Sequence, residues 1–243
     1  MHLPDGLLNN QASVGLIVVS ATMVSYALKQ MKNFLFEKTK VLVPQLMTNV
    51  GAMVGKQSFV NKLKLKTGAK KKIQQMILVF ALLFTFQALD FIAIGEFSGH
   101  LIGAVLAALV LGPWMGMLVM SAVLTTQALM LGDGGVLALG ANIINMAVIG
   151  CLGGYYLYFY LKKIIKNKYL AIGVATWLSL VAMAIVYSFE IAMFSSARLG
   201  TVLVSMLAIH ALVGIIEAVV TIFAFKFLPS TIFKQDDLSN IIK

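Results

Sequence analysis

The sequence predicts an all-α integral membrane protein with about seven transmembrane helices. Of its 243 residues, 60% are hydrophobic and 12% are charged, and the mean hydropathy is +0.94, whereas a soluble domain carries roughly 25% charged residues. The apolar runs are continuous and about 20 residues long, which suits membrane-spanning helices, and they lack the period-two alternation of a β-barrel. Because hydrocarbon offers no partner to backbone N–H and C=O groups, such runs have to pair those groups within a helix.

The apolar runs define the predicted helices, which together make one membrane domain over residues 1–243. The third run is short for a full crossing and stops at Gly112-Pro113-Trp114, since proline breaks a helix and tryptophan suits the membrane interface. With about 20 residues per span, the helices fall near 12–30, 75–95, 100–112, 114–131, 137–161, 169–194 and 202–227.

The distribution of basic residues predicts the orientation in the cell membrane. If residue 1 is outside, every Lys and Arg except Arg198 falls in a predicted inner segment, and cytoplasmic loops are where these residues collect. We therefore expect a multi-pass protein of the cytoplasmic membrane with an external N-terminus and a cytoplasmic C-terminus. The net charge of +10 is a signal of topology and of attraction to membrane lipid, and no nucleic-acid partner is predicted.

The segment 38–74 is predicted to be a basic cytoplasmic insertion between the first two helices. It contains Pro44, several glycines and the run LKLKTGAKKK. Its simplest interpretation is an inner loop lying at the lipid surface, and Lys56 disfavours an additional span across 41–60.

The opening MHLPDG has the chemistry of a metal chelate. It lacks the basic region and cleavage site of a signal peptide, and the large His2 disfavours removal of Met1, so we expect the mature chain to begin Met1-His2 on the outer side. The α-amine, the His2 amide nitrogen and His2 Nδ1 can supply three nitrogen donors in a plane. Such a set suits Ni(II) or Cu(II), with Co(II) below nickel in general affinity, whereas zinc prefers tetrahedral surroundings. The alternative is that His2 is a solvated residue at a frayed end.

Only two other histidines exist. His100, in GEFSGHL, falls at the outer end of the third predicted helix, on the same side as the N-terminus, and is the natural fourth donor. His210 lies about 12 Å along the last helix at 1.5 Å per residue. The alternative for His100 is an ordinary residue at a helix start.

Four motifs in order add up to a family resemblance: MHLPDGLL, FSGHLIGAVLAALVLGPW, GDGGVLALGANIINMAVIG and HALVGIIEAVVT. With them the chain resembles the CbiM/NikM family, the substrate-binding S components of cobalt and nickel energy-coupling-factor (ECF) ABC transporters. The resemblance implies that Met1, His2 and His100 bind Ni(II) or Co(II), the transported substrate, in a square-planar nitrogen site, with no catalytic cofactor.

The resemblance also implies high-affinity capture of the ion from outside, and uptake driven by a transmembrane coupling (T) component and two cytoplasmic ATPase subunits. The chain has no GxxxxGK[ST] motif, so ATP hydrolysis falls to the partners and the chain itself is not an enzyme. Nickel versus cobalt, a link to cobalamin biosynthesis and the need for a small accessory membrane subunit stay open.

Residues near the predicted site support it in different ways. Glu96-Phe97 stands where family members usually have a glycine-threonine pair before the serine-glycine-histidine, and its effect on the metal loop stays open. The carboxylates of Asp5, Glu96 and Asp133 favour approach of a cation, although Asp133 is most simply a turn residue. Ser98, just before Gly99-His100, is expected to support the loop.

Further polar residues fall within predicted spans. Gln87, Asn142 and Asn145 suit hydrogen bonding between helices, and Asn142 or Gln87 is expected to brace His100. Glu190, His210 and Glu217 indicate either a release path for the ion or a hydrogen-bond network that fixes packing.

Two other function classes compete with metal capture. An S component for an organic vitamin would not need His2. An intramembrane metallohydrolase using His100, His210 and a glutamate would lack any HExxH-type pair.

Overall fold

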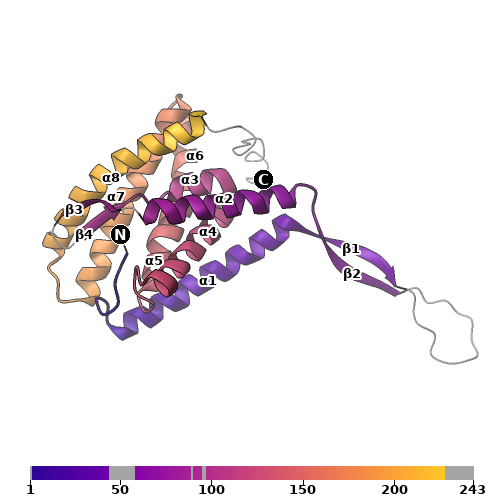
Figure 1. The fold of residues 1–243 in the computed structure, drawn as a ribbon, viewed down its shortest axis with the longest axis horizontal. Helices are drawn as coiled ribbons and strands as arrows, with labels where there is room; N and C mark the ends of the chain where they lie inside the picture. Colours follow the sequence, from indigo (N-terminus) through magenta and orange to yellow (C-terminus); the bar gives the residue numbers. More distant parts are fainter. Residues whose placement is uncertain (1, 44–57, 89, 95–96, 228–243) are drawn as a thin grey trace, which may run out of the picture.

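The computed structural model describes residues 2–43, 58–88, 90–94 and 97–227, and this part of the chain is a bundle of long helices (Figure 1). Five helical stretches in it are long and apolar enough to cross a membrane. They are α1 (Asn10–Leu35), α4 with its π-helical continuation η1 (Pro113–Thr126 and Gln127–Leu131), α5 with η2 and α6 (Leu139–Asn142, Ile143–Gly153 and Gly154–Ile164), α7 (Lys168–Phe194) and α8 (Leu199–Phe227). The predicted helical membrane fold is confirmed, while the count of seven spans and the orientation stay predictions.

The two remaining helices are not among these five stretches. α2 (Ala69–Gln87) has 19 residues, but three consecutive lysines, residues 70–72, lie in its first turn. α3 (Ala104–Leu111) has 8 residues, too few to cross about 30 Å of hydrocarbon at 1.5 Å per residue. Every residue of α3 is buried, so this helix is a core element surrounded by the others.

A β-hairpin lies where the sequence predicted the end of one helix, near residue 95, and the start of the next, near residue 100. β3 (Asp90–Ile94) pairs antiparallel with β4 (Phe97–His100), with Asp90 opposite His100. The prediction of helix up to residue 95, and again from 100, was wrong. β-Branched residues in the first strand and glycine in the second favour extended backbone over helix here.

A second hairpin occupies much of the predicted insertion. β1 (Phe36–Val43) pairs with β2 (Ser58–Leu65) in a register that runs from Phe36↔Leu65 to Val43↔Ser58. It extends away from the helices (Figure 1). Much of the expected surface loop is therefore a pair of hydrogen-bonded strands. Residues 44–57, between the two strands, lie outside the described part. The cytoplasmic placement of this insertion stays a prediction.

Small residues let the helices approach closely around α3. A Cβ on Gly116 of α4 would lie 2.7 Å from the Ala108 Cα, and a Cβ on Gly150 of η2 would lie 2.8 Å from the Ala104 Cβ. Close contact between small residues is the usual packing of helices in membranes, where dispersion and shape replace hydrophobic driving force. The small residues of GAVLAALVLG therefore let α3 pack closely against its neighbours.

Candidate metal-binding site

Two histidines from distant parts of the sequence meet at one end of the bundle. The imidazole rings of His2 and His100 have centroids 4.7 Å apart with 30° between their planes. The His2 side chain is 5% exposed and His100 is 4% exposed. His2 lies in the N-terminal segment that runs back from α1 toward β4 (Figure 1), and His100 is the last residue of β4. The geometry thus brings together the two side chains that the sequence singled out.

The N-terminal segment is held through the backbone of its third residue. The Leu3 N–H donates to Asn142 Oδ1 at 2.8 Å, and Asn142 Nδ2 donates back to the Leu3 carbonyl at 3.2 Å. The Gly135 N–H donates to the same carbonyl at 2.8 Å. The side-chain amide of Asn142 therefore binds the backbone next to His2, whereas the sequence offered it, or Gln87, as a brace for His100.

Asp133 contacts His2 directly. His2 Nδ1 lies 2.8 Å from Asp133 Oδ1, and with Nδ1 as the donor this hydrogen bond holds the pKa of Asp133 below its ordinary value. The sequence placed Asp133 near the site, as a turn residue whose carboxylate attracts a cation, but did not predict its contact with His2. An aspartate among the glycines of GDGG was the available signal, because glycine allows close approach of another backbone.

The glycines of the GDGG motif leave space for the N-terminal segment to lie against the loop. Gly134 has a φ of +77°, and a Cβ there would lie 3.2 Å from the Cβ of His2 and 3.0 Å from Asn142 Nδ2. A Cβ on Gly135 would overlap the carboxylate of Asp5. Side chains at either position would push the segment away from the site.

Asp5 fastens the loop that precedes α5. Its carboxylate accepts hydrogen bonds from the N–H groups of Val136 at 3.1 Å, Leu137 at 2.8 Å and Ala138 at 3.2 Å. The sequence predicted that the Asp5 carboxylate attracts a cation, and the structure shows that it also binds the backbone of this loop. The N-terminal segment and the loop 132–138 therefore hold each other in place.

The chain after His100 is anchored in the core by Glu217. Its carboxylate accepts from the N–H of Ile102 at 2.7 Å and of Gly103 at 2.9 Å. Gln87 Nε2 donates to the Ile102 carbonyl at 2.9 Å. Gly103 has a φ of +71°, and a Cβ there would collide with the side chain of Leu83. His100 is thus positioned through the backbone two and three residues downstream.

The bundle also contains hydrogen bonds of Asn145, Glu190 and His210. Asn145 Nδ2 donates to the Glu190 carboxylate, joining η2 to α7. His210 Nδ1 lies 2.9 Å from the Met206 carbonyl, one turn earlier in α8. The contacts of Asn145 and Glu217 join different elements, whereas the His210 contact lies within α8; a release path for the ion and a packing network both stay predictions.

His100 has the protonation state that a metal ligand needs. It lies outside the five long spans, and burial is the main cause that lowers its pKa well below the ordinary value of 6.5. The ring is therefore neutral at pH 7, the form in which imidazole coordinates a metal.

Three of the predicted site residues are described only in part or not at all. Met1 and Glu96 lie outside the described residues, and of Ser98 only the backbone, in β4, is described. Within residues 2–43, 58–88, 90–94 and 97–227, no group of three His, Cys, Asp or Glu side chains could hold a metal ion.

Comparison with known proteins places the chain in a family. The model of the CbiM family, described as the cobalt uptake substrate-specific transmembrane region, matches residues 44–231. The chain belongs to the CbiM family. A protein of Haloquadratum walsbyi described as a metal transport protein is 35% identical over 170 residues, which cover 67% of this chain and 77% of that protein.

Other CbiM-family relatives carry the names of two metals. The cobalt transport protein CbiM of Thermosipho melanesiensis is 29% identical over 183 residues, 70% of this chain and 77% of that protein. A protein of Archaeoglobus fulgidus described as a fused nickel transport protein, NikMN, is 38% identical over 146 residues, 59% of this chain. That match spans 49% of the fused protein, so the chain corresponds to about half of its length.

Solved structures share the fold of this CbiM-family chain. A crystal structure of a transition metal transporter superposes with a TM-score of 0.76 at 26% identity, covering 100% of this chain and 96% of the other. A truncated transition metal transporter gives a TM-score of 0.75 over 94% of this chain. The helical bundle and its long apolar spans thus belong to a multi-pass membrane protein.

Proposed function

We propose that this CbiM-family chain captures Ni(II) or Co(II) at the end of the bundle where His2 and His100 meet, for import into the cell. The stacked, buried pair of imidazoles carries the proposal. Family membership supports transport of these two metals, because relatives are named for cobalt and for nickel.

The donor set we propose is the α-amine of Met1, the amide nitrogen and Nδ1 of His2, and the imidazole of His100. Four nitrogen donors in a plane suit Ni(II), and they explain how a metal is held where the described carboxylate, thiolate and imidazole side chains form no three-ligand cluster. His2 Nδ1 lies 2.8 Å from Asp133 Oδ1, so a metal bound at Nδ1 would replace that hydrogen bond. The ring proton would then move to Nε2, and the amide proton of His2 would be released to solvent. The carboxylate then stays beside the ion and balances its charge.

We further propose that the chain is the high-affinity S component of an ECF-type ABC transporter in the cytoplasmic membrane. A T component and two ATPase subunits would supply the energy. Support comes from the absence of a GxxxxGK[ST] motif in the sequence and from the description of the family model as a substrate-specific region.

Metal titrations of the purified chain test the capture step. We expect His2→Ala and His100→Ala each to weaken Ni(II) and Co(II) binding by more than the 10–100-fold typical of residues that only orient a ligand. His210→Ala is the matched control, because His210 is also buried but bonds within its own helix. Equal affinity in all three variants would refute the assignment of these ligands.

Reconstitution tests the transport step separately. Co-expression with a T component and ATPase subunits of the same organism should give ATP-dependent uptake of radioactive nickel or cobalt into vesicles. An ATPase variant that binds but does not hydrolyse ATP is the control. Uptake that does not depend on those subunits would contradict the ECF assignment while leaving the binding site intact.

A further inference from the structure

A long apolar groove lies between α1 and α2, with α4 as its floor. Its cavity volume is about 950 Å³. Figure 1 shows α1 and α2 on the same face of the bundle, both leading to the β1–β2 hairpin. The walls are formed by aliphatic and aromatic side chains, among them Leu28, Met31, Ile73, Ile77 and Phe80.

The polar groups on the floor are already paired. Ser121 Oγ donates to the Met117 carbonyl at 2.8 Å, and Thr125 Oγ1 donates to the Ser121 carbonyl at 2.7 Å. These hydroxyls bond back into their own helix, so they do not require a polar partner in the groove. The groove therefore presents an apolar surface that suits a hydrocarbon chain.

The dimensions of the groove match one lipid leaflet. Its wall on α1 runs from Val24 to Leu35, about 16 Å at 1.5 Å per residue, and half of the hydrocarbon core is about 15 Å thick. The acyl chain of one leaflet therefore matches the length of this wall.

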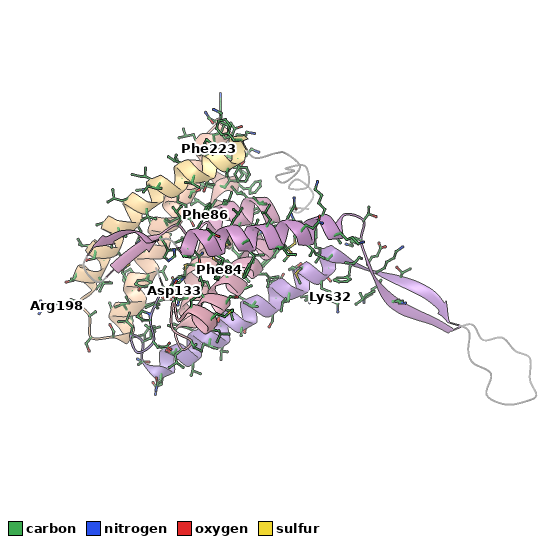
Figure 2. The ribbon with its side chains drawn as sticks, in the orientation of Figure 1. Lys32, Phe84, Phe86, Asp133, Arg198 and Phe223 are labelled. Atoms are coloured by element: carbon green, nitrogen blue, oxygen red, sulfur yellow. The ribbon has the colours of Figure 1, made fainter. Side chains whose placement is uncertain are left out.

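Lysines gather at the hairpin end of the groove. Lys32 follows Met31 of the wall on α1, and Lys70 precedes Ile73 of the wall on α2 by one turn; both are exposed. Lys66 is fixed there, since its N–H donates to the Leu35 carbonyl at 2.9 Å and its Nζ to the Asn33 carbonyl at 2.8 Å. Figure 2 shows Lys32 near the hairpin, at the end of the molecule away from Asp133.

The sequence around the groove has almost no acidic residue to neutralise these lysines. Between residues 29 and 72 the only carboxylate side chain is Glu37. Basic residues beside a membrane span attract anionic headgroups, by about fivefold in affinity for each Lys or Arg near the surface.

We infer that this groove is a binding site for an anionic phospholipid. One acyl chain lies between α1 and α2 over α4, and the phosphate of the headgroup lies against Lys32, Lys66 and Lys70. The site is separate from the histidine pair, so the inference does not rest on the proposed metal function.

Native mass spectrometry of the full chain, released from nanodiscs that contain equal phosphatidylglycerol and phosphatidylcholine, tests the inference. We expect one phosphatidylglycerol to stay bound in preference to phosphatidylcholine. Combined substitution Lys32→Gln, Lys66→Gln and Lys70→Gln should reduce that preference at least tenfold. The matched control replaces Lys162, Lys163 and Lys166, which are exposed at the end of α6 and just beyond it, by Gln and should keep the preference.

Filling the groove gives a second variant that leaves all charges unchanged. Ala122 of the floor is exposed, and Ala122→Phe should reduce retention of both lipids, with thermal unfolding verifying that the variant is folded. A photo-crosslinking residue at position 122 should label lipid in whole membranes. Equal retention of the two lipids by the unaltered chain, loss of preference in the Lys162, Lys163 and Lys166 control, or crosslinking to a protein subunit would overturn the inference.

Discussion

The two histidines of the site are held in place by residues in different surroundings. His2 is held from a surface loop, where Asp133 has a side chain 44% exposed, and from Asn142 just beneath it. His100 is held from the core by Glu217 and Gln87, each 2% exposed. Asn142 is also 2% exposed, so the contact near solvent on the His2 side is the one with Asp133. A buried group that satisfies backbone N–H groups is costly to remove, whereas a contact near solvent is exchanged with water at lower cost.

Removing the core anchor should have the largest effect. Glu217→Leu leaves the N–H groups of Ile102 and Gly103 buried without an acceptor, and we expect a loss of about 3–5 kcal/mol in stability together with loss of metal binding. Glu217→Gln retains one acceptor oxygen and should lose less. Thermal unfolding and metal titration measure both effects.

Glu190→Leu is the matched control for that substitution. Glu190 is also buried, but it pairs with Asn145 between η2 and α7. It should lower the unfolding temperature without a selective loss of metal affinity. Equal loss of metal affinity in properly folded Glu190 and Glu217 variants would contradict the role of Glu217 in positioning His100.

Releasing the N-terminal segment should come second. Asn142→Leu removes both hydrogen bonds to Leu3, and metal affinity should fall about 10–100-fold, as it does when residues that orient a ligand are lost. Asn145→Leu, three residues along, is the control because Asn145 bonds Glu190 instead. An Asn142→Leu chain with normal affinity and normal folding would show that the segment needs no anchor.

Acid should weaken the fold through His100. Its pKa is lowered in the folded chain, so between that value and about 6.5 the unfolded chain binds the extra proton. Stability therefore falls as the pH drops below about 6.5, by at most about 1.4 kcal/mol per pH unit.

Thermal unfolding of the metal-free chain between pH 7.5 and 5 measures this slope. His100→Gln removes the titrating ring and should flatten the dependence of stability on pH. In His210→Gln the contribution of His100 to that dependence should be retained. An unchanged slope in His100→Gln would contradict burial of a neutral ring at this position.

A crowded glycine should give the smallest effect. Gly134→Ala brings a Cβ to 3.2 Å from His2 at a φ of +77°. Gly132→Ala is the control, because Gly132 has a φ of +67° with nothing within 4 Å. Both substitutions cost about 1–2 kcal/mol of backbone strain. Only the Cβ at position 134 contacts His2, so only Gly134→Ala should also weaken metal binding, by a few fold in titrations. Equal affinities would mean that the loop gives way without moving His2.

The two paired histidines could be predicted from the sequence, but only some of the residues that hold them in place could. With three histidines and an unusual opening, His2 and His100 were readily proposed as partners. The contacts of Asp133 and Asn142 depend on how the chain folds over more than a hundred intervening residues, which local pattern does not specify. The β3–β4 hairpin was missed because its apolar residues continue the hydropathy of α2, so hydropathy does not show where the helix ends.

X-ray absorption at the nickel edge tests the central claim most directly. In the purified Ni(II)-loaded chain we predict four nitrogen donors in a plane, with the scattering of two imidazoles, and one imidazole after His100→Ala. One residue added before Met1 should abolish this spectrum, because the α-amine is displaced. A six-coordinate, oxygen-rich spectrum that neither change alters would contradict the account.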